Sequence, residues 1–140
     1  MLSSDRHTLR QFYQQTWLKA QQNQPLNALE TQIAHVIQEH PEYQAWLTQA
    51  YMDQDFSPEL GQTNPFLHLG LHLGLREQVA TDRPAGIRAL YQQLLVHYAA
   101  HDLEHQMMEC LAESLWQAQR DQQAPNEVAY LACLEQLRKL

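Results

Sequence analysis

The sequence predicts an all-α fold, a helical bundle of about six to seven helices in one domain covering residues 1–140. Residues that favour helices dominate the composition, with 21 Gln and 15 Ala against 4 Gly, and this disfavours a large sheet. Six prolines divide the chain into segments of helical length. Apolar residues recur within those segments every three to four positions, which is the period of an α-helix. A chain of this length can bury a core without disulfides or a structural metal.

The first two helices are expected before Pro41. The first covers residues 4–22 and has an apolar stripe formed by Leu9, Phe12, Tyr13, Thr16 and Trp17. The second begins after Asn27, which is followed three residues later by Glu30, a variant of the capping box. It ends at or before His40 because a proline restricts the residue that precedes it.

A short helix is expected over residues 42–50, followed by a loop over residues 52–63. Asn64 as N-cap and Pro65 in the first turn then start a helix over about 65–80. Apolar residues surround this helix on nearly all sides, which predicts a buried central helix: Phe66, Leu67, Leu69, Leu71, Leu73, Leu75 and Val79. Gly70 and Gly74 lie on one side of it and suggest that a neighbouring helix crosses closely there.

The C-terminal part of the chain predicts three further helices. Asp82 and Pro84 restart the chain, and the helix that follows is expected to reach about Tyr98. The next helix covers about 101–122, and no Gly or Pro marks the boundary between these two. Asn126 caps the last helix, which continues almost to the end of the sequence.

The helix over 101–122 places a carboxylate among apolar residues. Its apolar arc consists of Met107, Met108, Leu111, Leu115 and Ala118, and Glu104 falls inside this arc. A buried carboxylate without a partner is costly, so we expect Glu104 to accept a hydrogen bond from a histidine or an arginine, or to bind a metal. Arg76, one turn beyond His72, is a candidate partner for such a carboxylate.

Histidines and glutamates recur on these two helices at spacing that suits a metal ion. Residues four apart share one helix face, roughly 6 Å apart at Cβ. Such pairs supply the candidate ligands His68, His72, His101, Glu104, His105 and Glu109. Their nitrogen and oxygen atoms suit zinc, iron or manganese. The preferred set is His68, His72 and His105, with Glu109 or Glu104 completing the shell and both pairs facing one point in the bundle core.

Two alternatives stay open. The first is a metal-free interaction module that binds a protein partner or a second copy of itself, with the His/Glu cluster as a structural hydrogen-bond network. The second is a metal-free enzyme in which Glu104 and a histidine act as acid and base, which would require a cleft that reaches them. The segment from His101 to His105 also matches the H-x-x-E-H pattern of inverted zincins, but those enzymes need a further ligand and a cleft.

The net charge argues against some classes of binding partner, and the cysteine content indicates a cellular compartment. The formal net charge is −7 and the few basic residues are dispersed, so binding to nucleic acid or to an anionic membrane surface is not expected. The N-terminal residues have no apolar core typical of a secretory signal. Cys110 and Cys133 are far apart and form no paired motif, and Cys110 is expected to be a small buried apolar residue. Both observations favour reduced cysteines in a soluble, cytoplasmic protein.

The stretches NPFLHLGLHLGLREQVATDRPAGIRALYQQLL and HDLEHQMMECLAESLWQAQR resemble a bacterial family known only as domain of unknown function 1841. The resemblance implies no activity. It implies that ten residues belong to the characteristic blocks of the family: His68, His72, Arg76, Glu77, Asp82, Arg83, His101, Glu104, His105 and Glu109. The paired histidines are also similar to those of hemerythrin-like bundles, which bind two irons, although their order here is reversed. Small bundles of the DinB-like group, with a three-histidine metal site, are a looser similarity.

Overall fold

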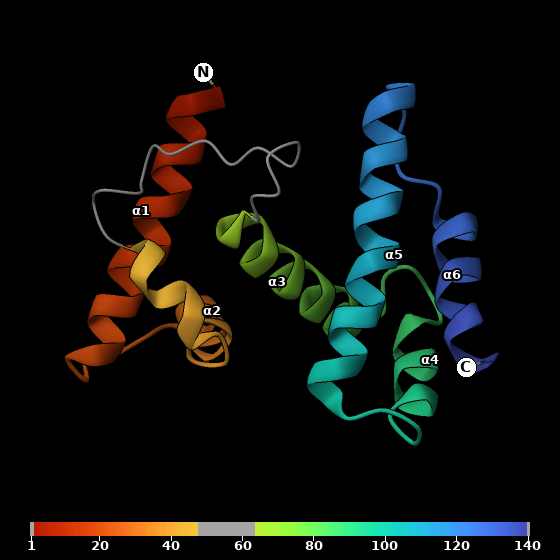
Figure 1. Cartoon of the computed structure of the whole chain (residues 1–140), viewed down its shortest axis with the longest axis horizontal. Coiled ribbons are helices and arrows are strands. Elements are labelled where there is room, and N and C mark those ends of the chain that lie inside the picture. The colour runs from red at the N-terminus through yellow and green to blue at the C-terminus, as the bar shows by residue number, and fades with distance from the viewer. Residues whose placement is uncertain (1, 48–63, 140) are drawn as a thin grey trace. The chain divides into compact units, whose positions relative to one another are not determined.

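The computed structural model describes residues 2–47 and 64–139, and the regular structure in these two ranges is entirely helical, which confirms the all-α class. Figure 1 shows the elements in chain order. Their bounds are α1 Leu2–Gln21, α2 Ala28–Gln38, η1 Pro41–Leu47, α3 Pro65–Thr81, α4 Ile87–Leu94, α5 Ala100–Asp121, α6 Glu127–Glu135 and η4 Gln136–Lys139.

The chain divides into two compact units, residues 1–70 and residues 71–140, and the division falls within α3. We describe each unit separately. The expectation of a single domain stays a prediction.

The first unit is built from α1, α2, η1 and the N-terminal part of α3. α2 packs against α1, and η1 contacts both of these helices. Their buried apolar residues include Tyr13, Ile33, Val36, Ile37 and Leu47. Charged residues are buried here as well: Glu30 is buried, and Arg10 is 2% exposed. The Arg10 guanidinium lies over the ring of Phe66 at 4.4 Å, a cation–π contact.

The capping box predicted at the start of α2 is confirmed. The Asn27 side chain accepts a hydrogen bond from the Glu30 backbone N–H at 2.8 Å, and the Glu30 carboxylate accepts one from the Asn27 backbone N–H at 3.0 Å. The same carboxylate accepts a bond from Lys19 Nζ at 2.8 Å. The Asn27 N–H, followed by the Lys19 side chain, lowers the pKa of Glu30. Lys19 therefore ties the end of α1 to the start of α2.

Replacing Asn27 with alanine should lower the free energy of unfolding by about 1 kcal/mol, because the backbone N–H of Glu30 loses its side-chain acceptor. Chemical denaturation at neutral pH measures the change. The control is Gln38→Ala at the exposed last residue of the same helix, which we expect to change stability by less than about 0.5 kcal/mol. Equal effects of the two substitutions would contradict a capping role.

The helix expected over residues 42–50 is a 3₁₀ helix, η1, over the described part of this range. It starts directly at Pro41. The rest of the expected helix, and the loop expected over 52–63, lie outside the described residues.

α3 starts as predicted, because Asn64 Oδ1 accepts hydrogen bonds from the backbone N–H groups of Phe66 and Leu67. Its apolar residues are not uniformly buried. Leu69 and Leu75 are 2% and 1% exposed, whereas Leu67 is 58% exposed. Apolar residues are common on protein surfaces, so the all-round apolar pattern overestimates how much of this helix is interior.

Among the residues that the structure describes, no helix crosses closely at the two glycines of α3. A methyl group built at Gly70 would lie 3.6 Å from the Tyr13 hydroxyl, and one at Gly74 would lie 3.9 Å from a methyl group of Leu111. Both distances are ordinary van der Waals contacts with side chains, whereas a crossing that requires glycine would bring backbone into contact. The expectation of a close crossing at this pair is therefore wrong for the described residues.

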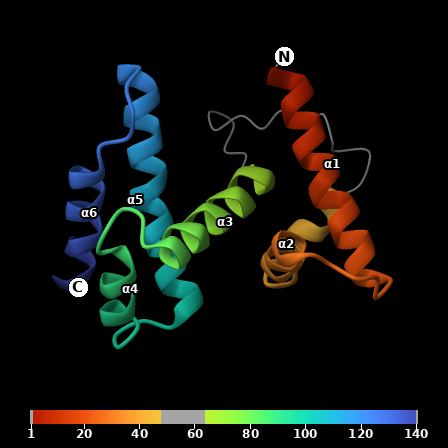
Figure 2. The ribbon, with the colours of Figure 1, turned by 180° about the vertical axis from the view of Figure 1, so that it is seen from behind.

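The second unit is built from α4, α5, α6, η4 and the C-terminal part of α3. In both views α6 runs beside α5 (Figure 1, Figure 2), and the two helices are in contact. One core joins all of these elements and contains Leu75, Ile87, Leu90, Leu94, Leu103, Met107, Met108, Cys110, Leu111, Tyr130, Leu134 and Leu137. The predicted apolar arc of α5 is thus buried over its N-terminal half, whereas Leu115 is 44% exposed.

α4 and α5 are separate helices. α4 ends at Leu94, four residues before the expected end at Tyr98. A turn follows, in which the Tyr98 N–H donates to the Leu94 carbonyl and the Tyr98 hydroxyl donates to the Leu137 carbonyl at 2.9 Å. The turn contains no Gly or Pro, and this contact with the C-terminal segment stabilises it instead. His97 therefore lies on the turn and does not extend the histidine stripe of α5.

Cys110 of α5 and Cys133 of α6 form a disulfide, with their Cα atoms 5.8 Å apart. The expectation of two reduced, unpaired cysteines was wrong. The residues are separated by 23 positions in the sequence and become neighbours only because α6 packs along α5. Cys110 is buried, as expected, but as half of a crosslink within the core.

In the described ranges, no helix has both the length and the apolar character needed to cross a bilayer.

Candidate histidine and glutamate centre

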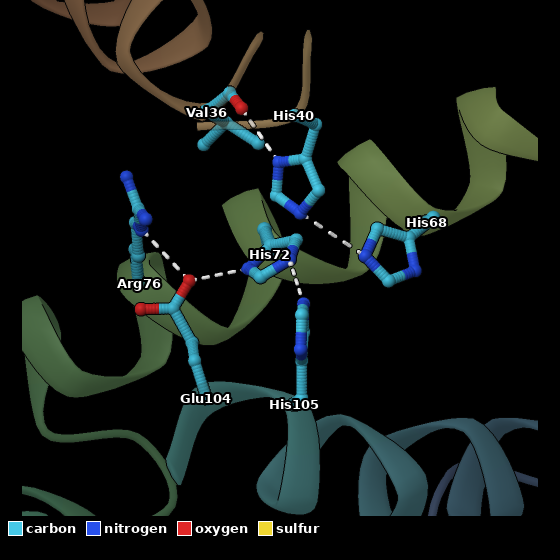
Figure 3. Close-up of polar contacts among 7 residues, drawn as sticks. All are labelled: Val36, His40, His68, His72, Arg76, Glu104 and His105. Atoms are coloured by element: carbon cyan, nitrogen blue, oxygen red, sulfur yellow. Dashed lines mark hydrogen bonds and ion pairs between the residues drawn. The ribbon is translucent and has the colours of Figure 1, made fainter. Parts of the chain in front are cut away.

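His72 is the central residue of the polar cluster in the second unit. It projects from α3, is fully buried, and its Nδ1 lies 2.5 Å from Oε1 of Glu104 on α5 (Figure 3). An ionised carboxylate only accepts hydrogen bonds, so the His72 Nδ1 carries the proton. A neutral imidazole with this tautomer has its lone pair on Nε2. Glu104 therefore orients the ring of His72 and determines which of its nitrogens is basic.

Glu104 is buried, as its place in the apolar arc predicts, and it has two partners. Its Oε1 accepts hydrogen bonds from His72 and, at 2.9 Å, from Arg76 Nε (Figure 3). This confirms that Glu104 pairs with a histidine or an arginine, and that Arg76 is a partner of the carboxylate. Burial raises the pKa of Glu104, but the hydrogen bonds from His72 and Arg76 and the positive charge of Arg76 outweigh it, so the pKa is lower than usual.

The second nitrogen of the His72 ring, Nε2, lies close to His105. The two Nε2 atoms are 3.1 Å apart (Figure 3). Because the His72 Nε2 carries a lone pair, two arrangements are chemically consistent. Either the His105 Nε2–H donates to His72, or both nitrogens present lone pairs to one cation. The predicted approach of His72 and His105 from two helices is thus confirmed.

His101 completes a group of three imidazole rings in the second unit. Its ring centroid lies 4.3 Å from that of His105 and 5.6 Å from that of His72, and the centroids of His72 and His105 are 4.9 Å apart. His101 and His105 share a face of α5, one turn apart, and both are partly buried. The three rings therefore lie close together, and the prediction that His101 is a metal ligand stays a prediction.

A pocket of about 290 Å³ in the second unit reaches Glu104. Its lining residues are Leu75, Arg76, Val79, Ala80, Tyr91 and Glu104. Burial and the negative charge of Glu104 raise the pKa of Tyr91, and Arg76 opposes this shift. The pocket gives a small molecule access to Glu104, which acid–base catalysis at this residue would require. Its wall is mostly apolar and lies beside the ion pair of Arg76 and Glu104.

In the first unit, His68 forms a second histidine pair, with a residue that the sequence analysis did not select. His68 Nε2 lies 3.2 Å from His40 Nε2, and His40 Nδ1 lies 2.7 Å from the Val36 carbonyl oxygen (Figure 3). The signal for His40 was weak because its partner lies 28 residues away and shares no helix with it. His68 and His72 lie one turn apart on α3, and their predicted convergence on one ion stays a prediction.

The remaining candidates have other surroundings. Glu109, a predicted ligand, is exposed on α5, so it is not brought into the buried histidine group. Asp82 accepts hydrogen bonds from the backbone N–H groups of Gly86 and Arg88 and thereby holds the turn before α4. Unlike Glu104, neither Glu109 nor Asp82 is placed by these contacts in the buried group around His72.

Comparison with known proteins places the chain in a family. Neither a curated protein nor a solved structure matches the chain significantly. Residues 5–136 match the family described as Domain of unknown function (DUF1841), which agrees with the resemblance of the two histidine-bearing stretches. The match covers nearly the whole chain, and the protein therefore belongs to the DUF1841 family.

Proposed function

We propose that this protein binds a transition-metal ion through histidines of its second unit, with His72 and His105 as ligands and His101 as the third. The observation that carries the proposal is the approach of two imidazole Nε2 atoms to 3.1 Å, one of which carries a lone pair because its ring donates to Glu104. Zinc, iron and manganese are the ions that such nitrogen ligands suit.

The separation of the two nitrogens supports this proposal. Zinc–nitrogen distances are about 2.0–2.1 Å, so two ligands of a tetrahedral ion lie about 3.3 Å apart. The 3.1 Å between His72 and His105 is close to that value. Three histidines would leave one tetrahedral position for water or a substrate, an arrangement typical of catalytic rather than structural zinc sites.

Glu104 has a supporting role in this proposal. A histidine that binds a metal commonly donates its other N–H to a carboxylate, which fixes the tautomer and increases the basicity of the ligand. The bond from His72 to Glu104 matches this arrangement, and Arg76 in turn holds the carboxylate. Glu104 is thus assigned to orient His72, whereas the sequence analysis offered it as a ligand.

A metal-free interaction module is the second candidate. It is favoured by the same contacts, because the His105 N–H can donate to the lone pair of His72 and close the network from Arg76 to His105 without an ion. The cluster would then specify packing of α3 against α5, and function would lie in the binding of another protein or of a second copy.

The test is elemental analysis of full-length protein purified without a histidine tag or chelator, combined with thermal unfolding. We expect bound zinc, iron or manganese in the wild type and a sharp fall in His105→Ala, because metal affinity depends on each ligand. His97→Ala, at an exposed histidine on the turn between α4 and α5, is the matched control and should keep its metal.

A different result would support the metal-free module. In that case the wild type binds none of the three metals, and His105→Ala lowers the free energy of unfolding by about 1–3 kcal/mol because a buried hydrogen-bond partner is lost.

A further inference from the structure

The first unit contains a histidine whose proton position is determined by the backbone. His40 is the second residue after α2, beyond the C-cap Glu39, and it is 1% exposed. Its Nδ1 lies 2.7 Å from the carbonyl oxygen of Val36. A carbonyl oxygen can only accept a hydrogen bond, so Nδ1 carries the proton and the neutral ring has its lone pair on Nε2.

The basic nitrogen of His40 is directed at a second imidazole. His40 Nε2 and His68 Nε2 are 3.2 Å apart (Figure 3). The ring of Tyr43 stacks on His40, with centroids 5.5 Å apart and an angle of 7° between the planes, and it meets the His68 ring edge-on at 5.3 Å. Aromatic contact on one side and the bond to Val36 on the other hold the His40 ring in a single orientation.

This arrangement repeats the chemistry of His72 and His105. In each pair, one ring donates its Nδ1–H to a fixed oxygen acceptor and presents Nε2 to the Nε2 of a partner at 3.1–3.2 Å. Both separations are close to the distance of about 3.3 Å between two nitrogen ligands of zinc. The acceptor is a backbone carbonyl in the first unit and a carboxylate in the second, and both are common partners of metal-binding histidines.

From this geometry we infer that His40 and His68 are ligands of a transition-metal ion. The inference names His40 as a ligand that the sequence analysis did not select. It keeps the metal class of the proposed function, but it concerns the first unit alone and does not depend on whether His72 or His105 is a ligand. The competing arrangement is a simple hydrogen bond, in which the His68 Nε2–H donates to the His40 lone pair.

The experiment compares zinc affinity in the full-length, untagged protein after removal of metal with a chelator. Zinc is added back under calorimetry to the wild type, His40→Gln, His68→Gln and His35→Gln. We expect His40→Gln and His68→Gln to weaken zinc binding at least about tenfold, because each removes a nitrogen ligand. His35 is an exposed histidine on α2, five residues before His40, and His35→Gln should bind like the wild type.

A second measurement guards against variants that fail to fold. In the wild type, side-chain ¹⁵N NMR of the histidines should show the Nε2 signals of His40 and His68 moving on zinc addition, while the Nδ1 of His40 stays protonated. Unchanged Nε2 signals, or wild-type zinc affinity in folded His40→Gln, would overturn the inference.

The same titrations on His72→Gln and His105→Gln separate this inference from the proposed function. Zinc binding that is weakened only by these two substitutions refutes the role of His40 and leaves the proposed function intact. Binding that is weakened only by His40→Gln and His68→Gln supports the inference and refutes the ligand role of His72 and His105.

Discussion

Replacing Glu104 with alanine should lower the free energy of unfolding of the metal-free protein by about 3 kcal/mol. The carboxylate is buried and accepts bonds from His72 and Arg76, so its removal leaves two polar groups without their acceptor. Breaking a buried ion pair by removing one partner costs about 3–5 kcal/mol. We place the effect at the lower end because the Arg76 side chain is 24% exposed and gains solvation. Denaturant unfolding at pH 7 measures it.

Glu109→Ala is the matched control, since it removes the same carboxylate from an exposed position on the same helix. We expect it to change stability by less than about 0.5 kcal/mol. If Glu104→Ala is no more destabilising than Glu109→Ala, the buried network contributes no stability and the assigned role of Glu104 is incorrect.

Glu104 should also make stability depend on pH in the acid range. Its pKa is lower in the folded protein than the ordinary value of 4.5, so the unfolded chain binds a proton more readily than the folded one. The contribution of Glu104 is therefore fully present above pH 4.5 and is lost as the pH falls below that value, through the folded pKa. The difference in stability between the metal-free wild type and Glu104→Gln should shrink over this acid range. A difference that grows on acidification would contradict the lowered pKa.

Removal of the disulfide should cost about 3 kcal/mol. The crosslink joins Cys110 and Cys133 across 23 residues, and closing a loop of that size in the unfolded chain accounts for a loss of this order. The double variant Cys110→Ala/Cys133→Ala should unfold at lower denaturant concentration than the oxidised wild type. α6 should still pack on α5, because Tyr130, Leu134 and Leu137 belong to the same core.

Two controls isolate the contribution of the crosslink. The wild type unfolded in the presence of a reductant should be about as stable as the double variant, and thiol titration should find no free thiol in the oxidised native protein. Two reactive thiols in the freshly purified native protein would show that the crosslink does not form under those conditions, and the predicted stability difference would then be absent.

Several features of this protein follow from its sequence because they depend on residues close together in the chain. Asn27, Asn64 and Asn126 each begin a helix by accepting backbone N–H bonds within the next three residues, and a local pattern is sufficient to find them. The prediction that Glu104 has a hydrogen-bond partner also depends only on nearby residues. Helical periodicity places the carboxylate among apolar residues, and the cost of burying a charge requires a histidine or an arginine beside it.

Other features were decided only by tertiary packing. His40 of the first unit contacts His68, which is 28 residues away in the sequence, and Cys110 pairs with Cys133 because α6 lies along α5. The end of α4 has no Gly or Pro, and its position depends on the bond from Tyr98 to the C-terminal segment. The sequence by itself determined where helices form and which faces are apolar, because these depend on residues close together in the chain. Pairing between distant residues leaves no periodic signal in either partner. The packed structure therefore decided which polar groups meet on those faces.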